Sequence, residues 1–243
     1  MNLSVVVPAH NEERYIVTCL NSVTEQCGAL GITPEIIVVC NRCTDRTGEV
    51  ARSQGATTID NDSRNLSNIR NTGIRHTTGE VIITIDADSI VTFEYIREVA
   101  GNIRSGRYVG GGTRVAFSRK SAGITATKLL LDLYVKVSGL SCGAFWFYRK
   151  YYDAINGFDE TLHFGEDIHF ARRLRALGKT MHLKYGTAGN ILTSTRKFDR
   201  YGDWYFFKLI TFKQNAIKNS MSGKDLSFVN EYFYDFNDRK SGG

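Results

Sequence analysis

Short apolar runs alternate with longer amphipathic stretches along the first ninety residues of the chain. The runs are rich in valine and isoleucine, which predicts strands. The stretches between them repeat apolar residues at helical spacing, as Ile16, Cys19, Leu20 and Val23 do. Strands that alternate with helices in this way predict right-handed crossovers and a mostly parallel sheet. The predicted strands are 3–7, 35–40, 57–59 and 81–85, and the predicted helices are 12–27, 45–54 and 66–76.

The second half of the chain continues the pattern less regularly. Three consecutive glycines open a predicted strand at 110–115, where they allow another backbone to approach closely. A bulge or a bend would explain the same glycines. Residues 124–137 predict a helix, the chain enters a further strand at 141–145, and another helix begins near residue 166.

The segment 196–224 interleaves aromatic and basic residues, and its charge of +5 accounts for most of the chain's formal +6. Such a helical stretch can dock on an anionic membrane and meet a lipid-linked acceptor. It can equally pack its aromatic face on the domain and leave its lysines in solvent, which we favour. Nucleic-acid binding is not expected, because no recognised module is present. The basic residues are Arg196, Lys197, Arg200, Lys208, Lys213, Lys218 and Lys224.

The composition is that of a single globular unit. The chain has 243 residues, of which 42% are hydrophobic and 23% charged, and no linker divides it. The first predicted strand begins at Leu3, which leaves no room for a signal peptide, and the later apolar stretches are too short to span a bilayer. Five cysteines, an odd number, favour a reducing compartment. These features predict a soluble, cytoplasmic protein, with a peripheral position at the inner face of the membrane as the alternative that 196–224 allows.

Two carboxylates, Asp86 and Asp88, follow the apolar run 81–85 with only Ala87 between them. A run of this kind predicts a strand buried on both faces, and its carboxyl end lies at the ligand edge of an open α/β sheet. Mg²⁺ and Mn²⁺ take oxygen ligands, and Mg²⁺ commonly uses one or two carboxylates together with substrate phosphates. The pair therefore predicts a metal and phosphate site. A turn or a helix cap would use the same residues.

No glycine-rich phosphate loop follows the first strand, so the dinucleotide and P-loop classes are excluded. The strand instead ends in Pro8, Ala9 and His10, followed by Asn11 and Glu12. The side chains of Asn11 and Glu12 can accept hydrogen bonds from a base or a ribose. Simple capping of the next helix explains Asn11 equally well.

Four motifs in order over the first ninety residues resemble those of family 2 glycosyltransferases of the GT-A fold. The resemblance implies a Rossmann-like, mostly parallel sheet flanked by helices. It also implies an inverting enzyme that uses a nucleotide sugar and Mn²⁺ or Mg²⁺. The motifs are Val5-Val6-Val7-Pro8-Ala9-His10-Asn11-Glu12-Glu13, Ile36 to Thr47, Arg70-Asn71-Thr72-Gly73-Ile74, and Gly79-Glu80 through Asp86-Ala87-Asp88.

The same resemblance assigns roles to individual residues. In that family the first two loops hold the base and ribose, the arginine helps to hold the nucleotide, and the Asp-x-Asp motif holds the metal and the diphosphate. It places Asp86 and Asp88 at the metal, with UDP- or GDP-sugar as the donor. The nucleotide-binding residues that we predict are Pro8, Ala9, Asn11, Glu12, Asn41, Asp45, Arg70, Asp86 and Ala87.

One departure from the family pattern concerns the base. Many members have two acids where this chain has Cys40 and Asn41, and the first of them commonly faces the base. A thiol cannot accept the strong hydrogen bond that a carboxylate accepts, so the pattern does not decide between uracil and guanine. The CxxC formed by Cys40 and Cys43 is then a variant nucleotide loop. A redox motif or half of a zinc site is the alternative.

The second half of the chain resembles the acceptor side of the family. Asn156 to Glu160 precede an acidic pair, Glu166 and Asp167, at a predicted helix start. Asp167 shares a helical stripe with apolar residues and should point inward, where the helix N-terminus favours its ionised form. Glu166 falls on a neighbouring stripe. Both acids would also suit a helix N-terminus for electrostatic reasons alone.

These observations predict that Asp167 is the catalytic base and that Glu166 orients the acceptor or a neighbouring side chain. We also place Arg196 and Gly143 at the diphosphate or the acceptor. The motif typical of processive synthases is absent, so we expect transfer of one sugar at a time.

The predicted unit is a catalytic domain at 1–195, with a nucleotide half at 1–90 and an acceptor half at 91–195, followed by a helical C-terminal segment at 196–243. Its acceptor would be a saccharide or a lipid-linked molecule in polysaccharide, glycolipid or other glycoconjugate synthesis. Two alternatives remain: a non-catalytic sugar-nucleotide or polyanion-binding protein on the same scaffold, and a nucleotidyltransferase.

Overall fold

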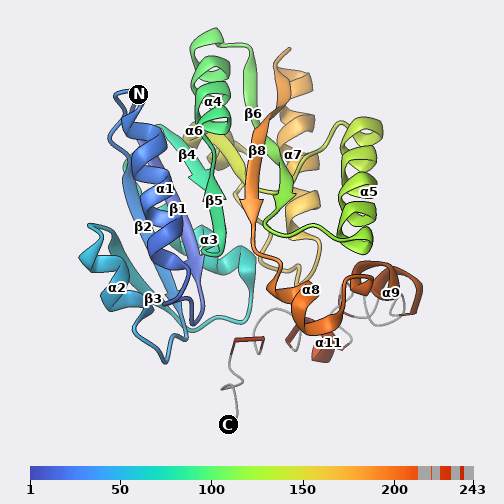
Figure 1. The fold of residues 1–243 in the computed structure, drawn as a ribbon. Helices are drawn as coiled ribbons and strands as arrows, with labels where there is room; N and C mark the ends of the chain where they lie inside the picture. Colours follow the sequence, from blue (N-terminus) through green and yellow to red (C-terminus); the bar gives the residue numbers. More distant parts are fainter. Residues whose placement is uncertain (213–219, 221–224, 231–235, 238–243) are drawn as a thin grey trace.

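The computed structural model describes residues 1–212, 220, 225–230 and 236–237, and its centre is one eight-stranded sheet (Figure 1). The strand order is β3-β2-β1-β4-β7-β6-β8-β5. The pairs β1–β2, β2–β3, β1–β4 and β6–β8 are parallel. The strands are β1 (Leu3–Ala9), β2 (Glu35–Asn41), β3 (Thr57–Asn61), β4 (Val81–Thr84), β5 (Ser89–Val91), β6 (Tyr108–Phe117), β7 (Phe145–Tyr148) and β8 (Lys184–Thr193).

Two strands run against the other six. β7 is antiparallel to both β4 and β6, and β5 is antiparallel to β8 at the edge of the sheet. The predicted mostly parallel sheet flanked by helices is therefore confirmed, and the antiparallel pairings lie in the second half of the chain. The carboxyl ends of β1, β2, β4 and β8 point toward one end of the molecule, the lower end in Figure 1.

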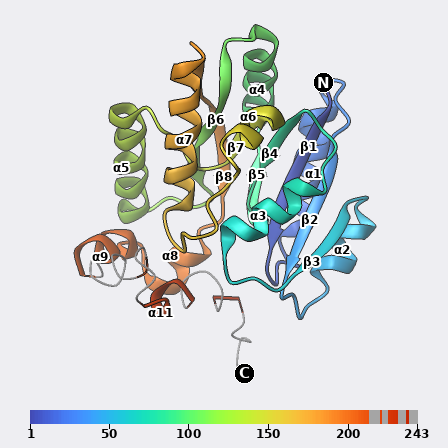
Figure 2. The same ribbon diagram turned by 180° about the vertical axis from the view of Figure 1, so that it is seen from behind.

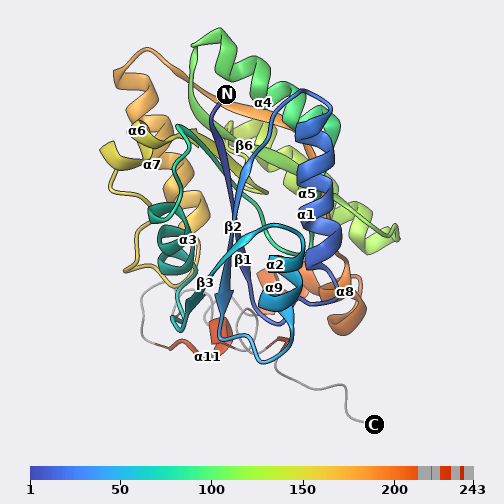
Figure 3. The ribbon, with the colours of Figure 1, turned by 90° about the vertical axis from the view of Figure 1, so that its left-hand side faces the viewer.

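Helices cover both faces of the sheet. Figure 2 shows α3, α6 and α7 on one face, and the side view in Figure 3 shows α1, α2 and α4 on the opposite face. The helices are α1 (Ile16–Gly28), α2 (Thr47–Ser53), α3 (Leu66–Arg75), α4 (Phe93–Ser105), α5 (Ala122–Ser138), α6 (Arg149–Ala154), α7 (Glu166–Thr180), α8 (Arg196–Tyr201), α9 (Tyr205–Phe212) and α11 (Ser227–Val229).

The alternation of side chains along β1 explains why the sheet is buried on both faces. Val5 and Val7 pack in the core beneath α1 and α4, whereas Val6 packs in the second core, with residues of α3 and α7. Successive side chains of a strand point to opposite faces, so an uninterrupted apolar run serves two cores at once. The buried strands predicted at 3–7 and 81–85 are confirmed.

The structure shortens two predicted helices at their N-termini. α1 begins at Ile16 instead of Glu12, because the chain first makes a turn in which Asn11 has a positive φ of 52°. α2 begins at Thr47 instead of Asp45, and the Asp45 carboxylate accepts a hydrogen bond from the Thr47 amide at 2.9 Å. In both cases polar side chains that suit a helix start belong to the preceding loop.

The described part of the C-terminal segment packs on the domain, as we favoured. Leu209 is buried, Tyr205 packs against the same core, and Lys208 is exposed. Lys213, Lys218 and Lys224 lie outside the described residues. Among the helices that the structure describes, none combines the length and the apolar character that crossing a membrane requires.

The glycines of β6 permit the close backbone approach that the sequence predicts. A Cβ atom on Gly111 would collide with the Gly186 carbonyl of β8, and one on Gly112 would collide with the Ser141 carbonyl. The loop before β7 can therefore lie directly on β6, which places Cys142 and Gly143 at the wall of a cleft.

We expect Gly112→Ala to lower the free energy of unfolding by about 3 kcal/mol, because the added methyl group meets backbone that cannot move aside. Gly101→Ala is the matched control, since its Cβ would enter open space in α4 and should raise stability by about 0.5–1 kcal/mol. Urea denaturation measures both. Equal effects of the two substitutions would contradict the close-approach role of Gly112.

Candidate functional site

Loops from four strand ends meet in one cavity of about 350 Å³. The loop after β1, the end of β2, the loop after β4 and the segment after β8 each contribute to its wall. Parallel strands bring their carboxyl ends to the same edge, so residues far apart in sequence become neighbours. The predicted site residues that line this cavity are Pro8, Ala9, Glu12, Asn41, Asp86, Ala87, Asp88 and Arg196.

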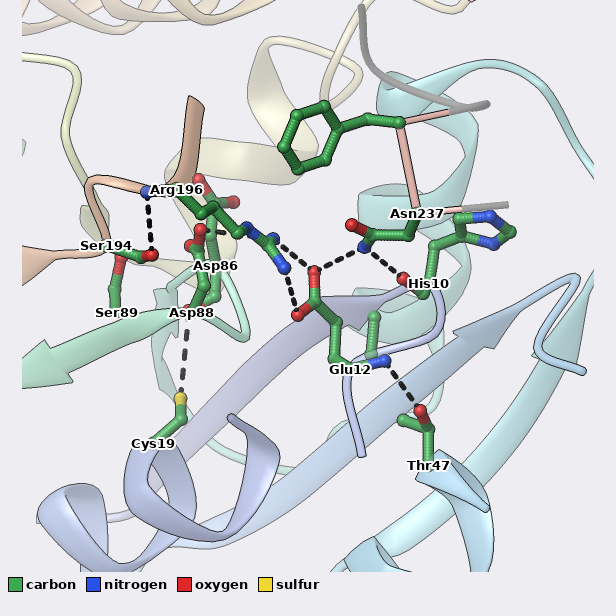
Figure 4. A network of polar contacts seen from close by, with 12 residues as sticks. His10, Glu12, Cys19, Thr47, Asp86, Asp88, Ser89, Ser194, Arg196 and Asn237 are labelled. Carbon is green, nitrogen blue, oxygen red and sulfur yellow. Dashed lines mark hydrogen bonds and ion pairs between the residues drawn. The ribbon is translucent and has the colours of Figure 1, made fainter. Parts of the chain in front are cut away.

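Arg196 joins the first loop to the Asp-x-Asp segment (Figure 4). Both of its terminal nitrogens donate to the Glu12 carboxylate, one at 2.7 Å, and Nη2 lies 3.1 Å from Asp88 Oδ2. Burial raises the pKa of Glu12 and of Asp88, and the charge of Arg196 partly offsets it. A bidentate guanidinium is well suited to hold two acids together.

Two residues near the C-terminus complete this network. Asn237 Nδ2 donates to Glu12 Oε1 at 2.9 Å and to the His10 carbonyl at 2.6 Å. The ring of Phe236 lies 5.5 Å from the Arg196 guanidinium. Asn237 and Phe236 also line the cavity, so the end of the chain contacts the predicted nucleotide site.

Lys197 is a second cation at the cavity wall. Burial lowers its pKa to about 8, although the negative charges of Asp88 and Asp86 oppose that shift. Together with Arg196 it gives the cavity two adjacent positive groups opposite the Asp-x-Asp carboxylates. The sequence analysis named Lys197 only as one of seven basic residues and did not assign it to the site. Its position directly after Arg196, which was assigned to the site, could have identified it.

Arg70 lies between the two halves of the site. Its guanidinium is buried, with Nη1 3.0 Å from Glu166 Oε1 and Nη2 3.4 Å from Asp86 Oδ1. Burial alone would lower the pKa of Arg70, but the charges of Asp86 and Glu166 outweigh it and raise the pKa. Glu166 therefore contacts a neighbouring side chain, one of the two roles predicted for it.

Asp167 opens α7 and faces a second cleft, of about 510 Å³. Its Oδ1 accepts a hydrogen bond from the Ile168 amide at 2.6 Å. Burial, and next the charge of Glu166, raises the pKa of Asp167 to about 6, while Arg70 opposes the shift. Gly143 lines the same cleft, and a Cβ there would lie only 2.6 Å from Val115 Cγ2. The two cavities adjoin, because Val115, Leu131 and Phe206 line both.

Two predicted nucleotide residues bond to loops instead of lining the cavity. Asn11 Oδ1 accepts from the Thr44 amide at 2.8 Å, and Asp45 Oδ2 accepts from the Glu13 amide at 3.1 Å. These bonds fasten the first nucleotide loop to the second. Their predicted contact with a nucleotide stays a prediction.

Asn41 lies at the end of β2 and is almost fully buried. Its Nδ2 donates to the carbonyls of Asn61 and Ser63 at 2.9 and 2.7 Å. Among the described residues, its Oδ1 has no hydrogen-bond partner. A buried acceptor without a donor is rare in native proteins, so this atom is a natural contact for an N–H group of a ligand.

The acids of the site fit a divalent cation that is shared with a substrate. The carboxylate of Asp86 is 52% exposed and lines the same cavity as that of Asp88. Within the described part of the chain no three metal-ligating side chains cluster, so an ion there would complete its shell with phosphate and water, as Mg²⁺ commonly does. The five carboxylates at positions 12, 86, 88, 166 and 167 face three cations at 70, 196 and 197, an excess of negative charge that a divalent cation would balance.

Comparison with known proteins gives a family and a fold. A model of the family "Glycosyl transferase family 2" matches residues 4–180. Glycosyltransferase GlyA of Streptococcus pneumoniae serotype 4 is 26% identical over 183 residues, which cover 73% of this chain and 24% of GlyA. The chain therefore spans about a quarter of the length of that relative.

Two solved structures share the fold. The mannosyltransferase PcManGT from Pyrobaculum calidifontis, in complex with GDP-Man and Mn²⁺, superposes with a TM-score of 0.64 at 17% identity, over 92% of this chain and 64% of that one. TarS 1-349 of S. aureus, in complex with UDP-GlcNAc, gives a TM-score of 0.59 at 16% identity, over 98% and 74%. At such identities the likeness establishes the fold alone.

We expect Glu12 and Arg196 to be strongly coupled, because Glu12 is buried, Arg196 is largely shielded, and removal of one leaves the other without its partner. A double-mutant cycle with Glu12→Gln and Arg196→Met should give a coupling free energy of about 1–3 kcal/mol. The partly exposed i, i+4 pair Lys128 and Asp132 of α5, mutated to Met and Asn, is the control and should give about 0.3–0.5 kcal/mol. A Glu12–Arg196 coupling no larger than this control would argue against the network.

Proposed function

This chain belongs to glycosyl transferase family 2, and from that premise we propose that it transfers one sugar from a nucleotide-diphosphate sugar to an acceptor hydroxyl with inversion. One observation carries the proposal: the cavity that holds Asp86 and Asp88 adjoins the cleft that ends at Asp167. A donor diphosphate in the first and an acceptor hydroxyl in the second would meet where the two walls are shared. A reaction between two bound substrates requires such a junction.

The donor would lie in the cavity with its base toward the ends of β1 and β2. Asn41 Oδ1, which has no hydrogen-bond partner in the part of the chain that the structure describes, suits an N–H group of uracil or guanine. The two solved structures are complexes with GDP-Man and with UDP-GlcNAc, so they do not decide between GDP and UDP. We therefore retain UDP- and GDP-sugars as donor candidates, and a hexose as the transferred group.

Asp86 and Asp88 would hold Mn²⁺ or Mg²⁺ together with the diphosphate. When bound, such an ion neutralises the charge that develops on the leaving diphosphate. Arg196, which contacts Asp88, and the adjacent Lys197 would bind the same phosphates. Arg70 would keep the Asp86 carboxylate in position, and Glu166 would in turn orient Arg70.

Asp167 would act as the base at the acceptor. As the acceptor oxygen forms its bond to the anomeric carbon, the bond from that carbon to the diphosphate breaks, and the hydroxyl proton passes to Asp167. A single displacement of this kind inverts the anomeric configuration. A pKa near 6 keeps Asp167 ionised at neutral pH and still basic enough to accept the proton.

The proposed catalytic unit comprises residues 1–195 together with the start of the following segment. Residues 1–90 supply the nucleotide loops and 91–195 the acceptor side, as the sequence predicts. Arg196 and Lys197 belong to the site as well, because both line the donor cavity. The cytoplasmic location of the protein stays a prediction.

We expect Asp167→Asn to lower the transfer rate by about 10³-fold while donor affinity changes less than twofold, because only the proton acceptor is lost. Asp153→Asn, an exposed acid on α6, is the control and should leave the rate unchanged. Steady-state kinetics and donor titration measure the two effects. Full activity of Asp167→Asn would refute its role as the base.

The pH dependence of the wild-type enzyme provides a second test of Asp167 as the base. Because Asp167 must be ionised to accept a proton and its pKa is about 6, kcat/KM should fall about tenfold per pH unit below that value. The residual activity of Asp167→Asn should lack this acid limb.

Thermal-shift measurements with nucleoside diphosphates, with and without Mn²⁺, test the donor site. One diphosphate should raise the melting temperature selectively, and the Mn²⁺-dependent part of the shift should vanish in Asp86→Asn and Asp88→Asn. Glu94→Gln, a charge change on α4 away from the cavity, should retain the full shift. No stabilisation by any diphosphate would refute the donor site.

A further inference from the structure

Helix α5 exposes a continuous apolar face. Five large side chains share it at positions i, i+1, i+4, i+5 and i+8, a spacing that puts them on one side of a helix. Apolar faces of this kind on a surface helix commonly mark a site of interaction. The exposed fractions are 64% for Leu129, 37% for Leu130, 54% for Leu133, 36% for Tyr134 and 80% for Val137.

This face continues into the cleft that ends at Asp167. Leu130 and Tyr134 belong to the exposed face and also line the cleft, and Leu131 and Val135 extend its apolar wall inward. The polar members of the lining are Thr113, Arg114, Asp132 and Asp167. A saccharide alone would leave most of its hydroxyl groups without partners on such a wall, whereas an alkyl or isoprenyl chain would be well accommodated.

Basic residues surround the apolar face. Lys120 and Lys136 are exposed at the two ends of α5, and Arg172 is exposed on the neighbouring α7. Three acids of the same region contact cations, and two of them share one arginine. Asp132, the acid of α5, bonds to Lys128, and Asp199 and Asp203 both bond to Arg119.

Helix α9 adds an aromatic group and a further positive charge. Trp204, directly before α9, is 51% exposed, and Lys208 is exposed one turn later. The preceding residue Asp203 packs its backbone against Gly123 of α5, so the two helices are neighbours. Tryptophan and tyrosine are enriched where proteins meet the lipid headgroups, and lysine and arginine are attracted to anionic lipids.

We propose that α5 lies on an anionic lipid surface and that the cleft receives the apolar, lipid-proximal part of a lipid-linked acceptor, whose hydroxyl then points to Asp167. The acceptor class rests on the proposed function, whereas the membrane contact does not. A second copy of the chain is a poorer occupant, because a symmetric contact through this face would bring two basic rims together. The proposed membrane contact is centred on α5 and includes Trp204 and Lys208, which belong to the segment 196–224 where the sequence allowed such a contact.

Flotation of the full chain with vesicles tests the membrane contact. We expect binding to vesicles of phosphatidylcholine with 30% phosphatidylglycerol, weaker binding to phosphatidylcholine alone, and at least a tenfold loss of bound fraction in Leu133→Glu/Val137→Glu. The control is Phe93→Glu/Met181→Glu, which adds the same charge at two other exposed apolar side chains, 43% and 45% exposed, outside α5 and should bind as the wild type does. Circular dichroism should show unchanged folding in both variants.

Tryptophan fluorescence supplies a second reading of the same contact. The chain has two tryptophans, and Trp146 is fully buried, so a blue shift on adding vesicles reports on Trp204. Equal vesicle binding by the α5 variant and its control would overturn the proposal. So would an α5-dependent dimer that does not bind vesicles, because the face would then be a contact between copies of the chain.

Transfer of labelled sugar to a total lipid extract tests the acceptor class, with the donor that thermal shifts identify. The label should enter the organic phase with the wild type and not with Asp167→Asn. Label found only in water-soluble saccharide would overturn the lipid-linked acceptor while the proposed transferase activity stands. Failure to bind any nucleoside diphosphate would instead refute the proposed function, and the vesicle result would then stand alone.

Discussion

Two arginines that are largely shielded from solvent make this site possible, because its acids would otherwise repel one another. Five carboxylates gather at one edge of the sheet, and burial raises the pKa of three of them, Glu12, Asp88 and Asp167. Arg196 compensates Glu12 and Asp88, and Arg70 compensates Asp86 and Glu166. Each guanidinium holds acids from two different loops, so the same contacts fix the relative positions of the loops.

The acids differ in exposure and in their contacts with the two arginines, and these differences suit them to different roles. Asp86 is half exposed and free to share a ligand, whereas Asp88 is held by Arg196. Asp167 receives less compensation, because Arg70 contacts Glu166 directly and Asp167 only through its field. Burial, and next the charge of Glu166, raises the pKa of Asp167 to about 6, and Arg70 offsets only part of that shift, so this acid is well suited to take a proton at neutral pH.

The sequence predicts those parts of the site that local chemistry determines. Apolar runs locate the strands, and the two carboxylates after the run 81–85 predict a metal and phosphate site at the end of β4, whereas Ala9 and Asn41 were assigned only because the loops that hold them resemble those of family 2 glycosyltransferases. Contacts between distant segments leave no local pattern. The pairing of Glu12 with Arg196, the approach of Asn237 and the position of Lys197 follow from where β8 enters the sheet. β8 itself was not predicted, since its sequence contains two glycines and no regular alternation.

The donor side and the acceptor side of the molecule are built differently. The donor cavity is built on strand ends of the central sheet and closed by buried ion pairs, so its geometry is fixed before any ligand binds. The cleft at Asp167 is walled on one side by α5, a helix that packs on β6 and presents its outer face to the surroundings. The donor is a single molecule that a rigid site can bind through fixed contacts. An acceptor anchored in a lipid surface requires in addition that the enzyme bind that surface in one orientation. The exposed helix α5, next to Asp167, is the element that can make this contact.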